Sequence, residues 1–318
     1  MRYDVIALGE LLIDFTENGL SARSNPVFEA NPGGAPCNVL AMLSRLGKKT
    51  SFLGVVGKDS FGTMLCQTLK EQDIDTSHLL FHPQIHTTLA FVHTLDMGER
   101  DFTFYRSPGA DTTLSPDQVE PEYIKSARAF HFGTLSMTHS PAREATYKAL
   151  EIADKAGILR SFDPNLRPPL WDDLEEARRQ IAYGLSHCDI LKISEEEVSF
   201  MTGLDDPYEG ARLLKMSYPG IRLMNVTLGR SGSISFYEGK EVFCKPFLRP
   251  DTVDTTGAGD TFGACALAFV LDNGTDALTE PMLLKMLRFA NAAAALVTTR
   301  KGALKVMPTI EEINGLCG

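Results

Sequence analysis

Strand-like and helix-like segments alternate along most of this chain. From residue 34 onward, short apolar runs typical of buried strands alternate with segments whose apolar residues recur at helical spacing. We expect helices over 35–46, 60–72, 141–156, 173–186, 206–216, 258–271 and 280–297, and strands over 50–56, 158–163, 188–193 and 222–228. Strands joined through helices form right-handed crossovers and a mostly parallel sheet covered on both faces. The pattern therefore predicts an α/β fold of the doubly wound class.

Two segments interrupt this alternation. Residues 10–30 and 87–106 have strand-type patterns with no helix between the strands, and the second indicates a hairpin that turns near Met97-Gly98. Extra β structure of this kind does not easily join a parallel sheet. We expect it to form a small lid over one edge of the main domain, although two ordinary edge hairpins are the alternative. The chain shows no interdomain linker, so we expect one domain over 1–318.

Composition narrows the range of partners and compartments. The chain has 318 residues, 43% hydrophobic and 23% charged, and a net charge of −10. This charge disfavours nucleic acid and anionic membranes as partners but permits small anionic nucleotides. The six cysteines are scattered, which indicates reduced thiols and no disulfide framework. With neither a signal-peptide layout nor an apolar run of about 18 residues, we expect a cytoplasmic protein.

The segment Asp254-Thr255-Thr256-Gly257-Ala258-Gly259-Asp260-Thr261-Phe262-Gly263 combines glycines with an acidic residue ahead of an apolar helix. A helix that begins here directs unpaired N–H groups and its positive dipole end at a bound anion. Asp260 lies in the first turn of this helix. A site that only bound phosphate would gain nothing from a carboxylate there, because like charges repel. Phosphoryl transfer needs both donors for the moving group and a base for the acceptor hydroxyl. The alternative is a glycine turn with Asp260 as a helix cap.

Further candidate residues lie near the N-terminus and in the second lid segment. Gly33 and Gly34 permit close approach of a ligand, and Asn38 offers a donor and an acceptor from the next helix. Asp14 lies among apolar residues and either points into a cleft or faces solvent on an edge strand. Strand alternation puts Phe104 and Arg106 on one face, where they could pack on a sugar and bind its oxygens or a phosphate. A solvated edge strand is the alternative.

Three strand ends supply the remaining candidates, because open α/β sheets bind ligands at their carboxyl edge. Asp163, Asn165 and Arg167 follow one strand, although Asp163 and Asn165 could simply form a turn. Lys192 lies at the end of the next. The spacing of Ser194 and Glu197 fits a capping box, and the functional alternative places Glu197 near hydrated Mg²⁺ and Lys192 near phosphates. The segment 226–232 follows a third strand and would let a nucleotide lie against backbone, or would form a hairpin turn.

Together these motifs resemble those of the ribokinase-like carbohydrate kinases (the PfkB family), and within that family the bacterial fructokinases. The chain has no P-loop and no dinucleotide-binding glycine pattern. The segments that carry the resemblance are Gly33-Gly34-Ala35-Pro36-Cys37-Asn38, continuing to Gly62, and Asp254 to Phe262. It runs from Gly9-Glu10 through Gly302. It implies a Rossmann-like α/β domain with a β lid often shared in a dimer, and the use of ATP, Mg²⁺ and frequently a monovalent cation such as K⁺.

The resemblance also implies roles for individual residues. Asp260 matches the base that deprotonates the sugar hydroxyl, and Gly257, Ala258 and Gly259 match the anion hole for the phosphoryl group. The positions that match sugar or phosphate contacts are Asp14, Gly33, Gly34, Asn38, Arg106 and Arg167. The positions that match ATP contacts are Lys192, Thr227, Gly229, Gly232 and Asn291. Asp254, Thr256 and the Arg300–Gly302 turn match the monovalent-cation loop.

One departure and two rival functions accompany this reading. The family's N-x-x-E motif has Ser194 in place of asparagine, which leaves Glu197 as the residue expected to place Mg²⁺. The resemblance implies phosphorylation of a sugar, with fructose as the expected substrate. A 2-keto-3-deoxygluconate kinase is the enzymatic alternative, because Arg106 and Arg167 could clamp a carboxylate. A non-catalytic nucleotide or sugar sensor is the alternative from another class.

Because Asp260 lies at a helix N-terminus, we expect it to have a low pKa.

Overall fold

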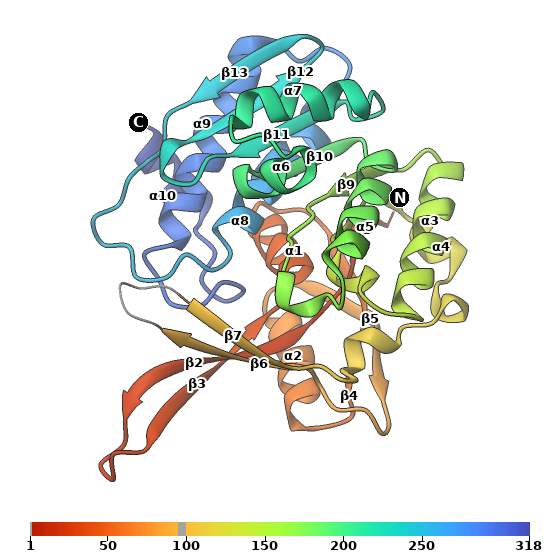
Figure 1. The fold of residues 1–318 in the computed structure, drawn as a ribbon, viewed down its shortest axis with the longest axis vertical. Coiled ribbons are helices and arrows are strands. Elements are labelled where there is room, and N and C mark those ends of the chain that lie inside the picture. The colour runs from red at the N-terminus through yellow and green to blue at the C-terminus, as the bar shows by residue number, and fades with distance from the viewer. Residues whose placement is uncertain (1, 95–99) are drawn as a thin grey trace.

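The computed structural model describes residues 2–94 and 100–318, so the hairpin turn predicted near Met97-Gly98 lies outside the described residues. A large sheet has the strand order β13-β12-β11-β10-β9-β8-β1-β4-β5 (Figure 1). Its strands from β5 to β11 pair in parallel, and only β12 and β13 are antiparallel. The bounds are β1 (Tyr3–Leu8), β4 (Thr50–Gly57), β5 (Ile74–His82), β8 (Ala127–Phe132), β9 (Leu159–Phe162), β10 (Ile190–Ser194), β11 (Leu223–Thr227), β12 (Ser233–Tyr237) and β13 (Lys240–Cys244).

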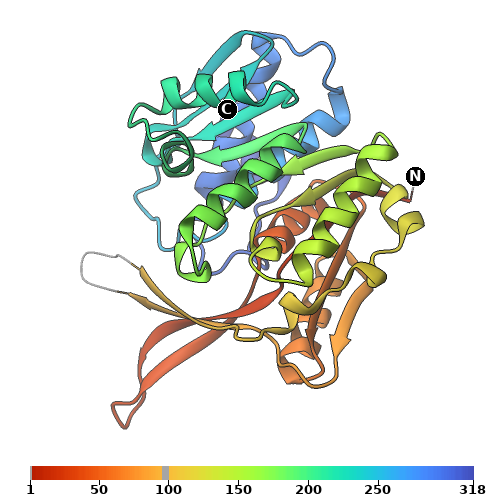
Figure 2. The same cartoon turned by 45° about the vertical axis from the view of Figure 1, so that its right-hand side comes forward.

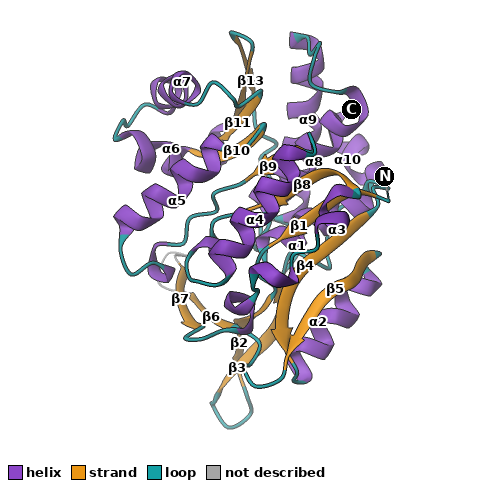
Figure 3. Ribbon diagram, turned by 90° about the vertical axis from the view of Figure 1, so that its right-hand side faces the viewer, coloured by secondary structure: helices purple, strands orange, loops and turns teal. Residues whose placement is uncertain are grey.

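Helices cover both faces of this sheet (Figure 3). One layer contains α1 (Ala35–Arg45), α2 (Ser60–Glu71), α8 (Ala258–Asn273), α9 (Glu280–Val297) and α10 (Ile310–Cys317). The other contains α3 (Pro121–Lys125), α4 (Ala142–Lys155), α5 (Leu174–Ser186), α6 (Glu195–Thr202) and α7 (Pro207–Ser217). Strand alternation divides the core accordingly: Val5 and Ala7 pack into the first layer, and Ile6 and Leu8 into the second. None of the described helices is long and apolar enough to cross a bilayer.

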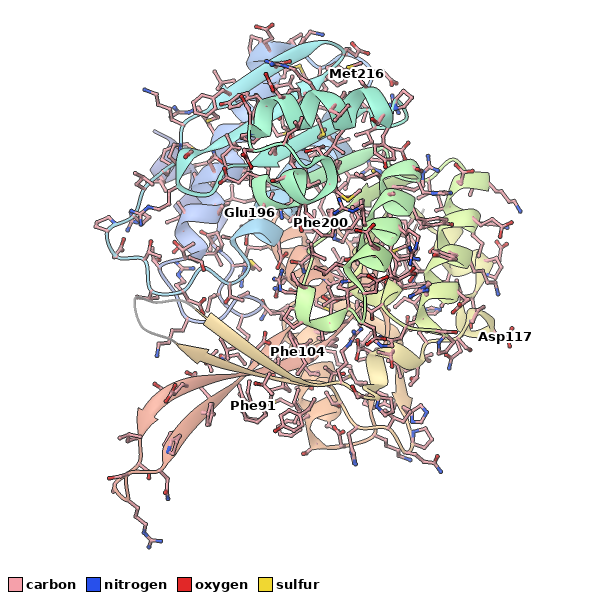
Figure 4. All side chains as sticks on the ribbon, in the orientation of Figure 1. Phe91, Phe104, Asp117, Glu196, Phe200 and Met216 are labelled. Carbon is pink, nitrogen blue, oxygen red and sulfur yellow. The ribbon has the colours of Figure 1, made fainter. Side chains whose placement is uncertain are left out.

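A second sheet stands away from the large one (Figures 1 and 2). Its strand order is β3-β2-β6-β7, with β2 (Leu12–Leu20), β3 (Pro26–Gly33), β6 (Leu89–Thr94) and β7 (Arg100–Tyr105). These strands come from the two segments in which we expected a lid, and we call this sheet the lid. Figure 4 labels Phe104 on the face of the lid toward the helical body and Phe91 on the opposite face.

The predicted α/β class, the mostly parallel sheet and the lid are confirmed. Each predicted helix and strand is present, with ends that differ by one or two residues. The central strand β8 was not among the predicted strands. Arg128 and His131 interrupt its apolar run, which hides a strand that is buried at every position except Arg128. All six cysteines are free thiols, as expected.

Candidate functional site

A cavity of about 910 Å³ lies where the carboxyl ends of the parallel strands face the lid. Strands of a parallel sheet point the same way, so the loops that follow them meet at one edge. Here the lid closes the side opposite that edge. All but one of the residues predicted to form the site line this cavity: Asp14, Gly33, Gly34, Asn38, Phe104, Asn165, Arg167, Lys192, Glu197, Thr227, Gly229, Gly232, Asp254, Thr256, Gly257, Ala258, Gly259, Asp260, Asn291 and Gly302.

The N-terminus of α8 opens into the middle of the cavity. Gly257 is the N-cap, with a φ of 77°, a left-handed conformation that glycine adopts without strain. A side chain there would lie 2.5 Å from the Cβ of Ala303. Within the described part of the chain, the amides of Gly257 and Gly259 have no hydrogen-bond acceptor. A helix start with free N–H groups and a positive dipole end is an anion-binding site.

Ala258 differs from its two glycine neighbours in this respect. It was expected to provide an anion-binding amide, but its N–H donates to the carbonyl oxygen of Thr255 at 3.3 Å. This bond closes the turn ahead of the helix. The two glycine amides are therefore the better candidates for the anion hole.

Asp260 occupies the third position of α8 and is only 8% exposed. Its Oδ2 accepts a hydrogen bond from Nδ2 of Asn38 at 2.8 Å. Contrary to the low value expected from the helix dipole, the pKa of Asp260 is raised from 3.8 to about 6. Burial is the main cause and the negative charge of Asp163 is the second, and both outweigh the hydrogen bond from Asn38 and the charges of Lys192 and Arg167.

A buried charge cluster surrounds this carboxylate. Nζ of Lys192, on β10, lies 3.0 Å from Oδ2 of Asp163, at the end of β9. Nζ also lies 2.8 Å from the point where a Cβ on Gly259 would stand, so the ammonium group lies against the anion hole. Burial opposes the charge of Lys192, but Asp163, Glu197 and Asp260 together raise its pKa. Lys192 is therefore a fixed cation at the place where a phosphoryl group would bind.

The sequence left two roles open for Asp163, a turn residue or a site residue, and the structure shows both roles. Its Oδ1 accepts the N–H of Asn165 at 3.2 Å, which forms the expected turn. The same carboxylate binds Lys192 and acts on the pKa of Asp260. Its position directly after a buried parallel strand was the signal that could have identified it.

Ser194 and Glu197 form the predicted capping box at the start of α6. The hydroxyl of Ser194 accepts the N–H of Glu197, and the Glu197 carboxylate accepts the N–H groups of Ser194 at 2.9 Å and Leu166 at 2.8 Å. Glu197 is only 7% exposed, and burial raises its pKa although Lys192 opposes the shift. The cap and the cavity position are therefore compatible, and Glu197 also joins the turn after β9 to α6.

The end of the cavity under the lid presents polar groups suited to a polyol. Asp14 of β2 lies so close to Gly33 of β3 that a Cβ there would be 2.2 Å from its Oδ2. On α1, no donor among the described residues reaches Oδ1 of Asn38, although the side chain is buried. A sugar hydroxyl could donate to that oxygen. Glu10, which sequence reasoning missed, also lines this end and accepts the N–H of Ala35 at 2.9 Å.

Arg106 is the one predicted site residue outside this cavity. Its Nε donates to Oδ2 of Asp111 at 2.8 Å, and its terminal nitrogens donate to Oγ1 of Thr138 and to the carbonyl oxygen of Leu135, both at 2.8 Å. The side chain is 3% exposed. The predicted substrate contact by Arg106 therefore does not fit the structure, because the guanidinium is occupied by protein groups.

The other end of the cavity is lined by residues of mixed polarity. Thr227, Gly229 and Gly232 follow β11 and line it, as predicted. Asn291 of α9 also lines it, but its amide already bonds to Ser233 and to the carbonyl oxygens of Cys244 and Lys245. Asn291 therefore holds α9 against β12 and β13. Residues missed from the sequence complete this end: Pro246, Phe247, Leu248, Arg249, Thr252, Ala294, Ala295 and Thr298.

Asp254 joins the two loops predicted to hold a monovalent cation. Its Oδ1 accepts the N–H of Thr256 at 2.8 Å, and its Oδ2 accepts the N–H of Gly302 at 3.1 Å. The turn around Gly302 is thereby fixed beside the start of α8. Among the described residues, no cluster of three histidine, cysteine or acidic side chains could hold a metal ion.

Comparison with known proteins agrees with this geometry. The family model for pfkB family carbohydrate kinases matches residues 3–310. The chain belongs to this family. Probable fructokinase-2 of Arabidopsis thaliana is 43% identical over 311 residues, which cover 96% of this chain and 93% of that protein. Fructokinase-1 of Zea mays is 42% identical over 311 residues, which cover 97% and 96% of the two chains.

Solved structures of the same family have the same fold. The crystal structure of fructokinase with bound ATP from Xylella fastidiosa has a TM-score of 0.89 and 30% identity, and covers 99% of this chain and 98% of its own. Fructokinase from Vibrio cholerae O395 in a fructose, ADP and calcium ion bound form has a TM-score of 0.89 and 30% identity, with 100% of both chains covered. The ribokinase-like fold implied by the sequence is confirmed.

Proposed function

We propose that this carbohydrate kinase transfers the γ-phosphoryl group of ATP to fructose and forms fructose 6-phosphate. The observation that carries the proposal is the arrangement at the start of α8, where free amides lie beside a buried carboxylate. The cavity has room for both substrates, with polar groups suited to a polyol under the lid and a second end beside α9. Full-length similarity to fructokinases, about 40% in identity, supports fructose as the sugar.

Asp260 is suited to act as the base. With a pKa of about 6, it is mostly ionised at neutral pH and can accept the hydroxyl proton as the oxygen attacks. The amides of Gly257 and Gly259 and the ammonium group of Lys192 then face the negative charge of the moving phosphoryl group. Most of the barrier reduction in such transfers comes from positioning and charge stabilisation. Asn38 holds Asp260 in place through its hydrogen bond.

We further propose Mg²⁺ and a monovalent cation as cofactors. Within residues 2–94 and 100–318, each oxygen of Glu197 accepts one backbone N–H, so lone pairs are left for water molecules of a hydrated Mg²⁺. When bound, Mg²⁺ would neutralise charge on the nucleotide phosphates. Ser194 is already used as the helix cap, so Glu197 carries this role alone. Asp254, Thr256 and Gly302 form the proposed loop for K⁺, an ion present in one of the related fructokinase structures.

The geometry favours fructose over 2-keto-3-deoxygluconate. The acid would need a basic clamp, for which Arg106 and Arg167 were the candidates. Arg106 is sequestered by Asp111, so that only Arg167 of this pair lines the cavity. The sugar end presents Asp14 and Asp260, whose negative charges would repel a substrate carboxylate. A neutral sugar meets no such penalty.

We also propose a cytoplasmic homodimer formed through the lid. The lid face turned away from the cavity carries an aromatic cluster of Phe15, Phe28, Phe91 and Tyr105, in which Phe15 and Phe91 stack at 4.9 Å. Tyr105 is 64% exposed. Exposed aromatic clusters of this kind are typical of protein interfaces.

A sugar panel tests the proposed activity directly. The protein is incubated with ATP, Mg²⁺, K⁺ and either fructose, glucose, ribose or 2-keto-3-deoxygluconate, and ADP formation and sugar phosphate are both measured. We expect fructose to give the highest kcat/KM. A preference for 2-keto-3-deoxygluconate would contradict the assignment of the sugar. Binding of ATP with no phosphorylated product from any sugar would indicate a non-catalytic sensor.

A further inference from the structure

A buried cluster lies at the base of the hairpin formed by β6 and β7. Thr88 lies directly before β6, and Arg106 lies directly after β7. Both side chains bind the carboxylate of Asp111, which belongs to the short 3-10 helix η2 (Ala110–Thr113). The Thr88 hydroxyl donates to Oδ1, and Arg106 binds Oδ2 through Nε at 2.8 Å and a terminal nitrogen at 2.7 Å. One carboxylate therefore holds both ends of the hairpin.

Arg106 extends this cluster to the wall of the cavity. Its remaining donors bind Oγ1 of Thr138 and the carbonyl oxygen of Leu135, and Leu135 lines the cavity. The side chains of Arg106 and Asp111 are 3% and 1% exposed. The cluster is also tightly packed, because a Cβ on Gly109 would lie 1.9 Å from Oγ1 of Thr88 and 2.9 Å from Cγ of Arg106.

The mechanism derived above uses none of these groups, and stability alone does not explain them. Replacing a buried ion pair by apolar side chains of similar volume is often neutral or stabilising, whereas removing one partner is strongly destabilising. What a multiply bonded guanidinium provides is a fixed geometry with several directional bonds. In this position it fixes the direction in which the hairpin leaves the body of the protein.

That direction determines where the sugar-facing residues of the lid stand. Phe104 lies two residues before Arg106 and lines the cavity. Asp14 pairs in register with Ala90 of β6, and the N–H of Ile13 donates to the carbonyl oxygen of Thr88 at 3.1 Å. A tilt of the hairpin at its base would therefore move Phe104 and Asp14 together, away from the reacting hydroxyl.

We propose that Thr88, Asp111 and Arg106 form a lid anchor that positions Asp14 and Phe104 over the sugar. The three are positioning residues, since they act through the lid and leave the substrates untouched. The functional part of this inference rests on the proposed sugar kinase activity. A loosened anchor should weaken sugar binding and let water reach the phosphoryl group, and it should have little effect on nucleotide binding.

The test uses Thr88→Val, which keeps the shape of the side chain and removes one hydrogen bond to a charged group, and Asp111→Asn as a second variant. We expect the KM for fructose to rise by roughly 10- to 150-fold in Thr88→Val, the effect of one such bond. The KM for ATP should change less than twofold, and ATP hydrolysis without sugar should increase. Thr50→Val is the matched control, because Thr50 is equally buried, makes one hydroxyl hydrogen bond to Ser44 and lies at the start of β4.

Hydrogen exchange separates the anchor from the activity. Amides of β6 and β7 should exchange faster in folded Thr88→Val and Asp111→Asn than in the parent protein, with no substrate present. Unchanged exchange and an unchanged KM for fructose in both variants would overturn the proposal. An equal rise of the KM for fructose and the KM for ATP would also overturn it. If the parent protein phosphorylates no sugar, the proposed function fails while the exchange result still decides whether the anchor exists.

Discussion

At the scale of single residues, the site is defined by charges that share one buried space. Lys192 is the cation in the middle, and Asp163, Glu197 and Asp260 surround it. Each carboxylate has a different fixed partner: the turn after β9, the start of α6 and Asn38. Desolvation and the charge of Asp163 raise the pKa of Asp260 and make it a stronger base than an exposed aspartate.

Replacing Asp163 should change the pH dependence of activity. The ionised form of Asp260 is the active one, so kcat/KM should fall as the pH drops through about 6. The charge of Asp163 raises that pKa, so Asp163→Asn should move the acid limb of the profile downward, by about 0.5–1 pH unit. The measurement is kcat/KM for fructose between pH 5 and pH 8.

Asp189→Asn is the control for this shift. Like Asp163, Asp189 forms an ion pair with a basic side chain, here Arg160, but it lies at the amino end of β10, outside the cavity. Its loss should leave the acid limb in place. An upward shift in Asp163→Asn, or the same shift in both variants, would argue against electrostatic control of Asp260 by Asp163.

The sequence identified most residues of the site but not their states. Asp260, Gly257 and Asn38 were recognisable because they belong to short motifs with fixed spacing. The raised pKa of Asp260 was not predictable, since it depends on burial and on Asp163, which is distant in sequence. The ion pair between Arg106 and Asp111 was not predictable either, because strand alternation gives the face of the sheet on which a side chain lies but not its partner.

At the scale of elements, the start of α8 is where local sequence and function coincide. Two features require glycine at position 257: the left-handed backbone conformation and the Ala303 side chain beside it. The helix α8 and the strand β4 were predicted with nearly correct ends, because each is a largely apolar segment with a glycine at its boundary. β8 was not, because a central strand buried between neighbours can carry polar residues that its sequence alone does not explain.

Gly257→Ala should impair both stability and catalysis. The new methyl group adds a contact at 2.5 Å to the strain of a positive φ, so the start of α8 must shift. We expect kcat to fall at least tenfold and the free energy of unfolding to drop by about 1–3 kcal/mol. Gly239→Ala is the matched control, because its φ of 75° is nearly equal and nothing lies within 4 Å of its added Cβ.

These two variants separate backbone strain from the role of the site. Gly239→Ala should lose some stability through its positive φ and keep its kcat. If Gly257→Ala also kept its kcat, the geometry of the α8 N-terminus would not matter for phosphoryl transfer. Urea unfolding and steady-state kinetics on both variants provide the comparison.

At the scale of the whole molecule, the two sheets supply different parts of the site. The large sheet and its two helical layers hold the charge cluster and the start of α8, and the lid brings a polar face to the sugar (Figures 1 and 2). The lid's other face is aromatic and exposed at Tyr105. The sequence predicted the lid because its segments lacked helices, but it did not reveal how the lid is anchored.

Tyr105→Ser should weaken the proposed homodimer. Tyr105 is the most exposed residue of the aromatic cluster, and removing such a side chain from an interface often costs more than about 1 kcal/mol. Sedimentation velocity at several protein concentrations should show a shift toward monomer. Met216→Ser is the control, since Met216 is 79% exposed on α7, far from the lid (Figure 4). A parent protein that is monomeric at all concentrations would contradict the dimer.

The most direct test of the account is the turnover of Asp260→Asn. The variant keeps the size of the side chain and removes the proton acceptor, so kcat for fructose phosphorylation should fall about 10²–10⁴-fold. Nucleotide binding and the thermal unfolding transition should be retained, which shows that the loss is chemical. Turnover within a few-fold of the parent in a folded Asp260→Asn would contradict the role of this carboxylate as the base, and with it the proposed mechanism.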